Sequence, residues 1–165
     1  MMGDVAGATE AFDKAASIGD NATVSNNVGA VTHRNEGKAT DRVNELLSAS
    51  NTAEAKYNMG LIQVEEGRYE EAITSMGETK SFNVALAQLL AGHNDDASQT
   101  LDANEDNPAL NYYLKAIIGA RTNNSEMVMD NLKSAFEKDA SLKDKAKTDR
   151  EFIKFFENAD FLAIF

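Results

Sequence analysis

The two histidines, His33 and His93, are the first candidates for acid–base or metal chemistry, because imidazole titrates near neutral pH and binds divalent metals. They lie about sixty residues apart, and neither belongs to an HExxH pattern, which places two zinc ligands on one helix face. We therefore expect His33 to be a helix residue that faces solvent or a groove, and His93 to be a turn residue. Neither is expected to bind a metal or to take part in catalysis.

Alternating oxygen-bearing residues at Asp102, Asn104 and Asp106 are the next candidate, because a calcium-binding EF-hand loop begins in this way. That loop also needs glycine at its sixth position and glutamate at its twelfth. Here those positions hold Asn107 and Tyr113. The segment is therefore predicted to be a charged turn and not a calcium site.

Other catalytic and cofactor patterns are not found in the sequence. It contains no GxxxxGK[ST] or GxGxxG phosphate loop, and it has no cysteine for thiol catalysis, disulfides or thiolate-bound zinc. Paired carboxylates such as Glu65–Glu66 and Glu70–Glu71 have the spacing of the polar face of an amphipathic helix. We expect a protein without enzymatic activity and without a cofactor.

The charge of the chain limits its partners. Sixteen basic and 27 acidic residues give a formal net charge of −11, so the surface repels phosphate backbones and nucleic-acid binding is not expected. No apolar run approaches the roughly 20 residues of a membrane span, so direct membrane insertion is not expected either. The start, MMGDVAGATEAF, lacks the basic and apolar regions of a signal peptide. We expect the chain to be part of a larger protein.

The spacing of apolar residues predicts the helices that hold the rest of the chain. In the stretch from Ala53 to Ile73, apolar residues recur every three or four positions on both sides of Gly67, which predicts two amphipathic helices joined by a turn. Glycine suits the left-handed residue that often follows a helix. Gly60 and Ala72 are twelve residues apart, and we expect them to meet where the two antiparallel helices pack closely.

This pattern resembles the tetratricopeptide repeat (TPR), a helix–turn–helix unit of about 34 residues with a small residue eight places into its first helix and alanine twelve later. The resemblance implies one all-α domain over 1–165, a TPR-like right-handed superhelix of antiparallel helix pairs with a C-terminal capping helix. Its expected parts are a half repeat at 3–17, helix pairs at 22–48, 53–79, 81–104 and 109–139, and a cap at 141–165. Within the last pair, Ser125 is the expected N-cap of the second helix.

The C-terminal segment is rich in phenylalanine, with five of the eight phenylalanines between residues 152 and 165. A helical array exposes an apolar face at its last repeat, and these rings would cover it. Asp149 is the expected cap of a helix that carries the first of them. The alternative is an exposed patch that binds a partner.

In this family the first helix of each repeat lines a concave groove, and the resemblance implies that a protein or peptide binds there. When the groove positions of the family are assigned to this sequence, they hold aromatic, amide and aliphatic side chains. This mixture is suited to peptide binding. For Leu86 and Ile117, packing between helices is an equally good interpretation. The residues of this predicted groove are Asn26, His33, Tyr57, Asn58, Leu61, Phe82, Asn83, Leu86, Tyr113, Ile117 and Arg121.

The function implied is a non-enzymatic scaffold for protein–protein interaction. The alternative is a structural spacer or self-assembly module, including a homodimer through the N-terminal helix, where Val5, Ala8 and Phe12 form an apolar stripe. The segments YNMG, KSFNVALAQLL and YYLKAIIGARTNN also resemble the repeat region of Gram-negative envelope-associated proteins. That similarity implies a periplasmic or outer-membrane-associated setting, with the cytoplasm as the alternative.

Overall fold

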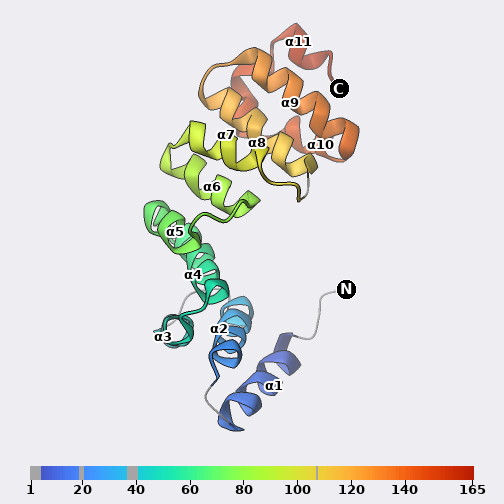
Figure 1. Ribbon diagram of the computed structural model, residues 1–165. Helices are drawn as coiled ribbons and strands as arrows, with labels where there is room; N and C mark the ends of the chain where they lie inside the picture. The colour runs from blue at the N-terminus through green and yellow to red at the C-terminus, as the bar shows by residue number, and fades with distance from the viewer. Residues whose placement is uncertain (1–4, 19–20, 37–40, 107) are drawn as a thin grey trace. The chain divides into compact units, whose positions relative to one another are not determined.

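Helices make up all the regular structure that the computed structural model describes (Figure 1). The described residues are 5–18, 21–36, 41–106 and 108–165, and within the first three helices several side chains, those of Phe12 and His33 among them, lie outside the description. Over these ranges the expected all-α class is confirmed. The chain forms two compact units, Met1–Glu78 and Thr79–Phe165.

The first unit is a series of helices joined by short connections. α2 packs along α3 and α4 packs along α5, so that each pair is a helical hairpin, while α1 packs on α2. The two hairpins run over 22–50 and 53–76, where the sequence-based expectation was 22–48 and 53–79. The helices are α1 (Val5–Ile18), α2 (Ala22–Glu36), α3 (Asp41–Ser50), α4 (Ala53–Glu65) and α5 (Tyr69–Met76).

Gly60 lies where α4 crosses α5. A methyl group built at this residue would lie 2.5 Å from Cγ of Met76 and 3.1 Å from the carbonyl oxygen of Ala72. Both distances are shorter than favourable carbon contacts of about 3.5–4.0 Å. The missing side chain therefore allows the close approach, and the fully buried Ala72 lies on the facing helix. Packing gained across this crossing offsets the roughly 1 kcal/mol that a mid-helix glycine costs.

Local hydrogen bonds fix the ends of α4. The Thr52 hydroxyl accepts a hydrogen bond from the Ala55 backbone N–H at 3.1 Å, which satisfies one of the free donors at the helix start. At the other end, Gly67 has φ of +77°, the left-handed conformation that glycine adopts at little cost. The left-handed turn predicted at Gly67 is thus present.

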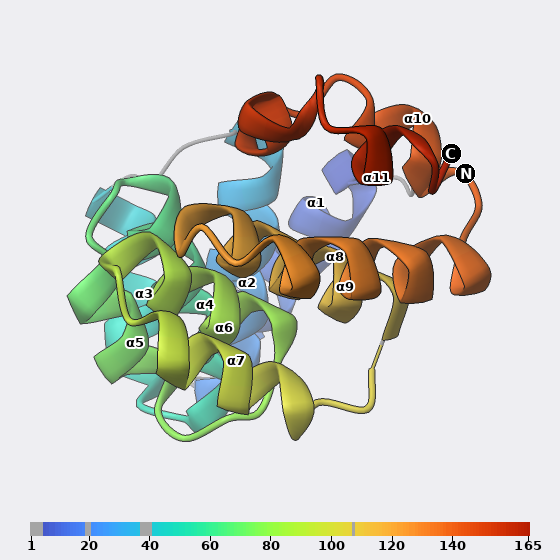
Figure 2. The same ribbon diagram turned by 90° about the horizontal axis from the view of Figure 1, so that it is seen from above.

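The second unit begins with two more hairpins, α6 (Phe82–Ala91) with α7 (Asn94–Asp102) and α8 (Pro108–Arg121) with α9 (Ser125–Lys138). Figure 2 shows α8 and α9 running side by side. One core joins α6 and α7 to α8, which ties the first hairpin to the second. Its buried residues are Ala85, Leu89, Ala97, Leu101, Leu114 and Ile118.

The start of α9 differs by one residue from the prediction. The N-cap is Asn124, whose side-chain oxygen accepts a hydrogen bond from the Met127 N–H at 3.0 Å, and Ser125 is already the first helical residue. Both residue types are good caps, so sequence alone does not separate them. Close packing within this hairpin centres on Gly119, where an added methyl group would lie 3.0 Å from the backbone nitrogen of Val128.

The C-terminal segment consists of three short elements and not of one capping helix: α10 (Leu142–Ala146), the 3₁₀ helix η1 (Arg150–Phe155) and α11 (Ala159–Leu162). Asp149 caps η1 by accepting from the Glu151 N–H at 3.1 Å, and Asn158 caps α11 in the same way. Because each cap starts a new element, the segment turns repeatedly and folds over α8 and α9.

Phenylalanine side chains of this segment complete a core with α8 and α9. Phe152, Phe155 and Phe161 are buried together with Phe136 of α9 and Tyr113 of α8. For these three rings the structure agrees with a closing role and not with an exposed patch. None of the described helices combines the length and apolar character that a bilayer crossing requires.

Candidate functional site

The predicted groove residues of the first unit include one hydrogen-bonded pair of amides. Asn58 on α4 donates its side-chain N–H to the side-chain oxygen of Asn26 on α2 at 2.9 Å. Asn26 is buried, and its own amide lies 3.4 Å from the side-chain oxygen of Asn27. The bond links α2 and α4, the first helices of two successive hairpins.

Tyr57 and Leu61 of α4 flank Asn58 in sequence, and both are half-buried. Together the three present an aromatic ring, an amide and an aliphatic side chain from one helix. The His33 side chain lies outside the described residues, so the structure does not place it relative to this surface. We call Asn26, Tyr57, Asn58 and Leu61 the α2–α4 face.

On α6, the predicted groove residues Phe82 and Leu86 are half-buried and pack against the core that α6 and α7 share with α8. Ile117 of α8 packs against the same core. The structure thus brings these three together as packing between helices, the second of the two interpretations of Leu86 and Ile117. Asn83, also on α6, is half-buried.

Tyr113 on α8 is almost fully buried, with 3% of its surface exposed. Its hydroxyl donates to the Asp149 carboxylate at 2.8 Å, and the Phe152 ring meets it edge-on with centroids 5.6 Å apart. The Lys145 ammonium lies 4.9 Å from the ring centroid. Burial first, and then the hydrogen bond to Asp149, raise the pKa of the Tyr113 phenol well above its usual range. The hydroxyl is therefore a structural donor to the C-terminal segment.

Arg121, at the end of α8, also contacts the C-terminal segment. Its guanidinium donates to both carboxylate oxygens of Glu151, from Nε at 3.0 Å and from Nη2 at 2.6 Å. A third contact runs from Nη1 to the backbone carbonyl of Leu89 at 3.3 Å. The α8 positions expected to line an open groove are therefore engaged by the chain itself.

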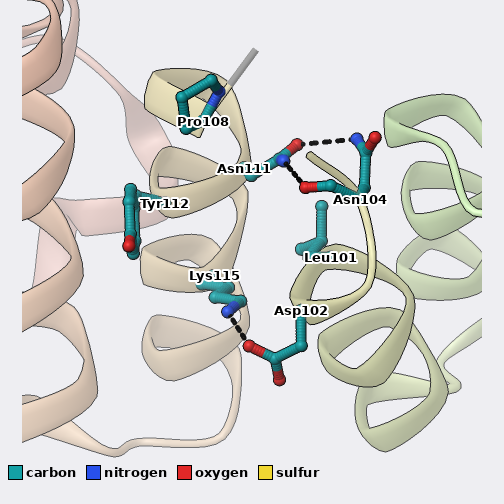
Figure 3. A pocket seen from close by; sticks show the side chains of 7 residues that line it. All are labelled: Leu101, Asp102, Asn104, Pro108, Asn111, Tyr112 and Lys115. Atoms are coloured by element: carbon teal, nitrogen blue, oxygen red, sulfur yellow. Dashed lines mark hydrogen bonds and ion pairs between the residues drawn. The ribbon is translucent and has the colours of Figure 1, made fainter. Parts of the chain in front are cut away.

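A small hollow of about 140 Å³ lies at the connection between α7 and α8, and sequence reasoning did not identify it as a site (Figure 3). Asn111 donates to the backbone carbonyl of Asn104 at 2.8 Å, while the Asn104 amide donates back to the Asn111 side-chain oxygen at 3.1 Å. Lys115 pairs with Asp102 beside them.

The hydrogen bonds of this hollow lie within the turn or join the turn to Asn111 in the first part of α8. The Asp106 N–H donates to Asn104 Oδ1 at 3.1 Å, and the Asp106 carbonyl accepts from Asn111 at 2.9 Å. The alternation at Asp102, Asn104 and Asp106 therefore closes the α7–α8 connection, as the predicted charged turn would. The only signal in the sequence was the polar cluster itself, because helical spacing does not continue across a turn and so does not predict that Asn104 and Asn111 meet.

The histidine and carboxylate side chains were also compared with the requirements of a metal site. Within the described residues, no three histidine or carboxylate side chains come together as a possible metal site. His93 is exposed at the start of α7, where its Nδ1 lies 3.6 Å from the Asp96 carboxylate.

Comparison of the chain with protein-family models, curated proteins and solved structures gives no match.

Proposed function

We propose that this chain is a non-enzymatic scaffold for protein–protein interaction, built from TPR-like helix pairs in a right-handed array. The proposal rests on the Asn26–Asn58 hydrogen bond, which aligns the first helices of two successive hairpins on one face. Aromatic, amide and aliphatic groups beside that bond, at Tyr57 and Leu61, are the types that bind extended peptides. The partner is therefore a protein or peptide segment, and the α2–α4 face is its site.

The close helix crossing at Gly60 supports the family part of the proposal. The TPR resemblance requires small residues at positions 60 and 72, and the steric limits at Gly60 explain why a larger residue would not fit. Gly119 imposes a similar limit on the α8–α9 hairpin. A periplasmic or outer-membrane-associated setting, with the cytoplasm as the alternative, belongs to the same proposal.

A structural spacer is the second candidate function, and one observation favours it for the second unit. There Tyr113 and Arg121 are hydrogen-bonded to Asp149 and Glu151 of the C-terminal segment. Because the chain's own residues cover this face of α8, the face can stabilise the helical array but offers no open groove to a partner. The scaffold proposal therefore concerns the α2–α4 face, and the spacer role concerns α8 and the segment that covers it.

Site-specific photo-crosslinking separates the two functions. Benzoylphenylalanine introduced at Tyr57 of the full chain should give an ultraviolet-dependent adduct with a partner in cell extract. The matched control is the same group at Thr74, an exposed residue of α5. An adduct from Tyr57 and none from Thr74 supports a binding face on α4.

The partner identified in this way then allows a direct measurement. Tyr57→Ala should weaken its binding in calorimetry without changing the circular dichroism spectrum of the chain, because aromatic anchors commonly carry much of the binding energy. Equal adducts from both positions, or unchanged affinity of Tyr57→Ala, would count against the scaffold and favour the spacer.

A further inference from the structure

A second surface lies at the C-terminal end of the second unit. It is a hollow of about 340 Å³ lined by Lys147, Phe156, Phe161, Leu162 and Phe165, contributed by three short segments. The volume lies at the lower end of the range of roughly 300–1,000 Å³ that binding pockets occupy. Hence the hollow has room for one large side chain and its neighbour, but not for a whole helix.

The lining is aromatic and partly open. Phe161 is buried, with its ring centroid 5.9 Å from that of Phe156 and 5.1 Å from that of Phe165. Phe156 and Phe165 are half-buried, and Leu162 is 58% exposed. Packing of the core accounts for Phe161 but does not require Leu162 to point outward. Leu162 is thus an exposed apolar side chain at the edge of the aromatic hollow.

The charge of the lining narrows the kind of partner. Lys147 is the charged residue among the lining side chains, and its ammonium lies 5.5 Å from the centroid of the Phe165 ring. Its ion pair with Asp144, at 3.3 Å, is exposed, with side-chain exposures of 52% and 90%. An exposed ion pair of this kind contributes little to the free energy of folding, so Lys147 can exchange Asp144 for another carboxylate at little cost. Lys147 can therefore meet a carboxylate from outside at the edge of an apolar hollow.

From this combination we propose that the hollow binds a segment of a partner protein that presents a large apolar side chain next to one carboxylate. The apolar side chain fills the space between Phe156, Phe161 and Phe165, and the carboxylate pairs with Lys147. A net charge of −11 disfavours a second copy of the chain and an anionic lipid surface as occupants. It also favours a segment that is otherwise neutral or basic. This proposal does not depend on the α2–α4 face.

Blocked dipeptides test the proposal on the full chain. The probes are acetyl-Phe-Glu-amide, its uncharged match acetyl-Phe-Gln-amide, and acetyl-Ala-Glu-amide, which lacks the apolar side chain. Methyl NMR signals of Leu162, assigned with Leu162→Ala, report binding. We expect the Phe-Glu probe to shift these signals, the Phe-Gln probe to bind about two- to fivefold more weakly, as for an exposed ion pair, and the Ala-Glu probe not to bind.

Lys147→Gln provides the matched control, because it removes the charge and leaves a polar, flexible side chain that is only one atom shorter. In this variant the Phe-Glu and Phe-Gln probes should bind equally, and the Phe-Gln affinity should match that of the unmodified chain. Absence of any Leu162 shift would overturn the proposal, as would charge preference that survives Lys147→Gln. Leu162 signals that change on dilution without probe would assign the hollow to a second copy. Preferential shifts with phosphatidylglycerol vesicles would assign it to a lipid surface.

Discussion

Substitution of Gly60 by alanine tests the close crossing of α4 and α5 directly. Alanine gains about 1 kcal/mol of helix propensity over glycine. Against this, its Cβ would lie 2.5 Å from Met76 Cγ and 3.1 Å from the Ala72 carbonyl oxygen, and overpacking of this kind costs about 1–3 kcal/mol. We therefore expect Gly60→Ala to lower the free energy of unfolding by up to about 2 kcal/mol. Gly60→Leu should lower it considerably more.

A double-mutant cycle with Met76→Ala isolates the steric cause. Met76 is 4% exposed, so Met76→Ala alone should cost about 2–5 kcal/mol. It also removes the nearest obstructing atom, so that adding Gly60→Ala in this background should be neutral or stabilising by up to about 1 kcal/mol. The expected coupling between the two substitutions is then about 1–3 kcal/mol.

Gly119→Ala is the matched control, because the nearest obstructing atom there is the Val128 backbone nitrogen at 3.0 Å, which no side-chain truncation removes, whereas at Gly60 the nearest is Cγ of the Met76 side chain. Urea titration followed by circular dichroism gives the free energies, and hydrogen exchange of α4 and α5 amides locates the transition. Additivity of Gly60→Ala and Met76→Ala within about 0.5 kcal/mol would refute the packing argument. Gly60→Ala more stable than the unmodified chain would refute it as well.

Three further predictions concern hydrogen bonds of the second unit. Tyr113→Phe should cost about 1.5–3 kcal/mol, because it removes a buried donor from the Asp149 carboxylate. The raised pKa of Tyr113 means that folding favours the protonated phenol, so the unmodified chain should lose stability more steeply above about pH 10 than Tyr113→Phe does, as measured by urea midpoints across that pH range. Asn111→Ala should cost about 1–3 kcal/mol, since it leaves groups of the Asn104 turn unpaired, and faster amide exchange at Asn104 and Asp106 would check the location. Asn124→Ala should cost about 0.5–2 kcal/mol through loss of the α9 cap, whereas Ser125→Ala, the control, should be nearly neutral in the same urea titration.

The sequence predicted features that depend on neighbouring turns of one hairpin. Gly60, Gly67 and Ala72 lie within a few helical turns of each other, so spacing alone indicates a close crossing and a left-handed turn. Capping is also local, so the sequence predicts Asp149 as a cap, although the element that it starts is a 3₁₀ helix. The prediction of Ser125 as the N-cap of α9 was wrong, because the neighbouring Asn124 is an equally suitable cap residue and takes that position.

Features that depend on distant packing were beyond the sequence argument. Repeat positions place Tyr113 and Arg121 on an open face only if nothing follows the last hairpin. The Asp149 and Glu151 side chains reach them from 36 and 30 residues away, and no periodic pattern encodes those contacts. The phenylalanine-rich composition indicated that a closure exists, but not which face of α8 it covers.

Arg121 has a consequence for the order in which the chain folds during synthesis. The hairpins α6–α7 and α8–α9 use local contacts and can form as soon as they leave the ribosome. The bonds to Glu151 wait for residues 30 positions further along. At about 5–20 residues per second, the interval between release of Lys138 and of Phe161 is roughly one to five seconds. In that interval the C-terminal side chains that share a core with Tyr113 and Phe136 are not yet available. Apolar surface exposed in this way is prone to aggregation until the segment closes over it.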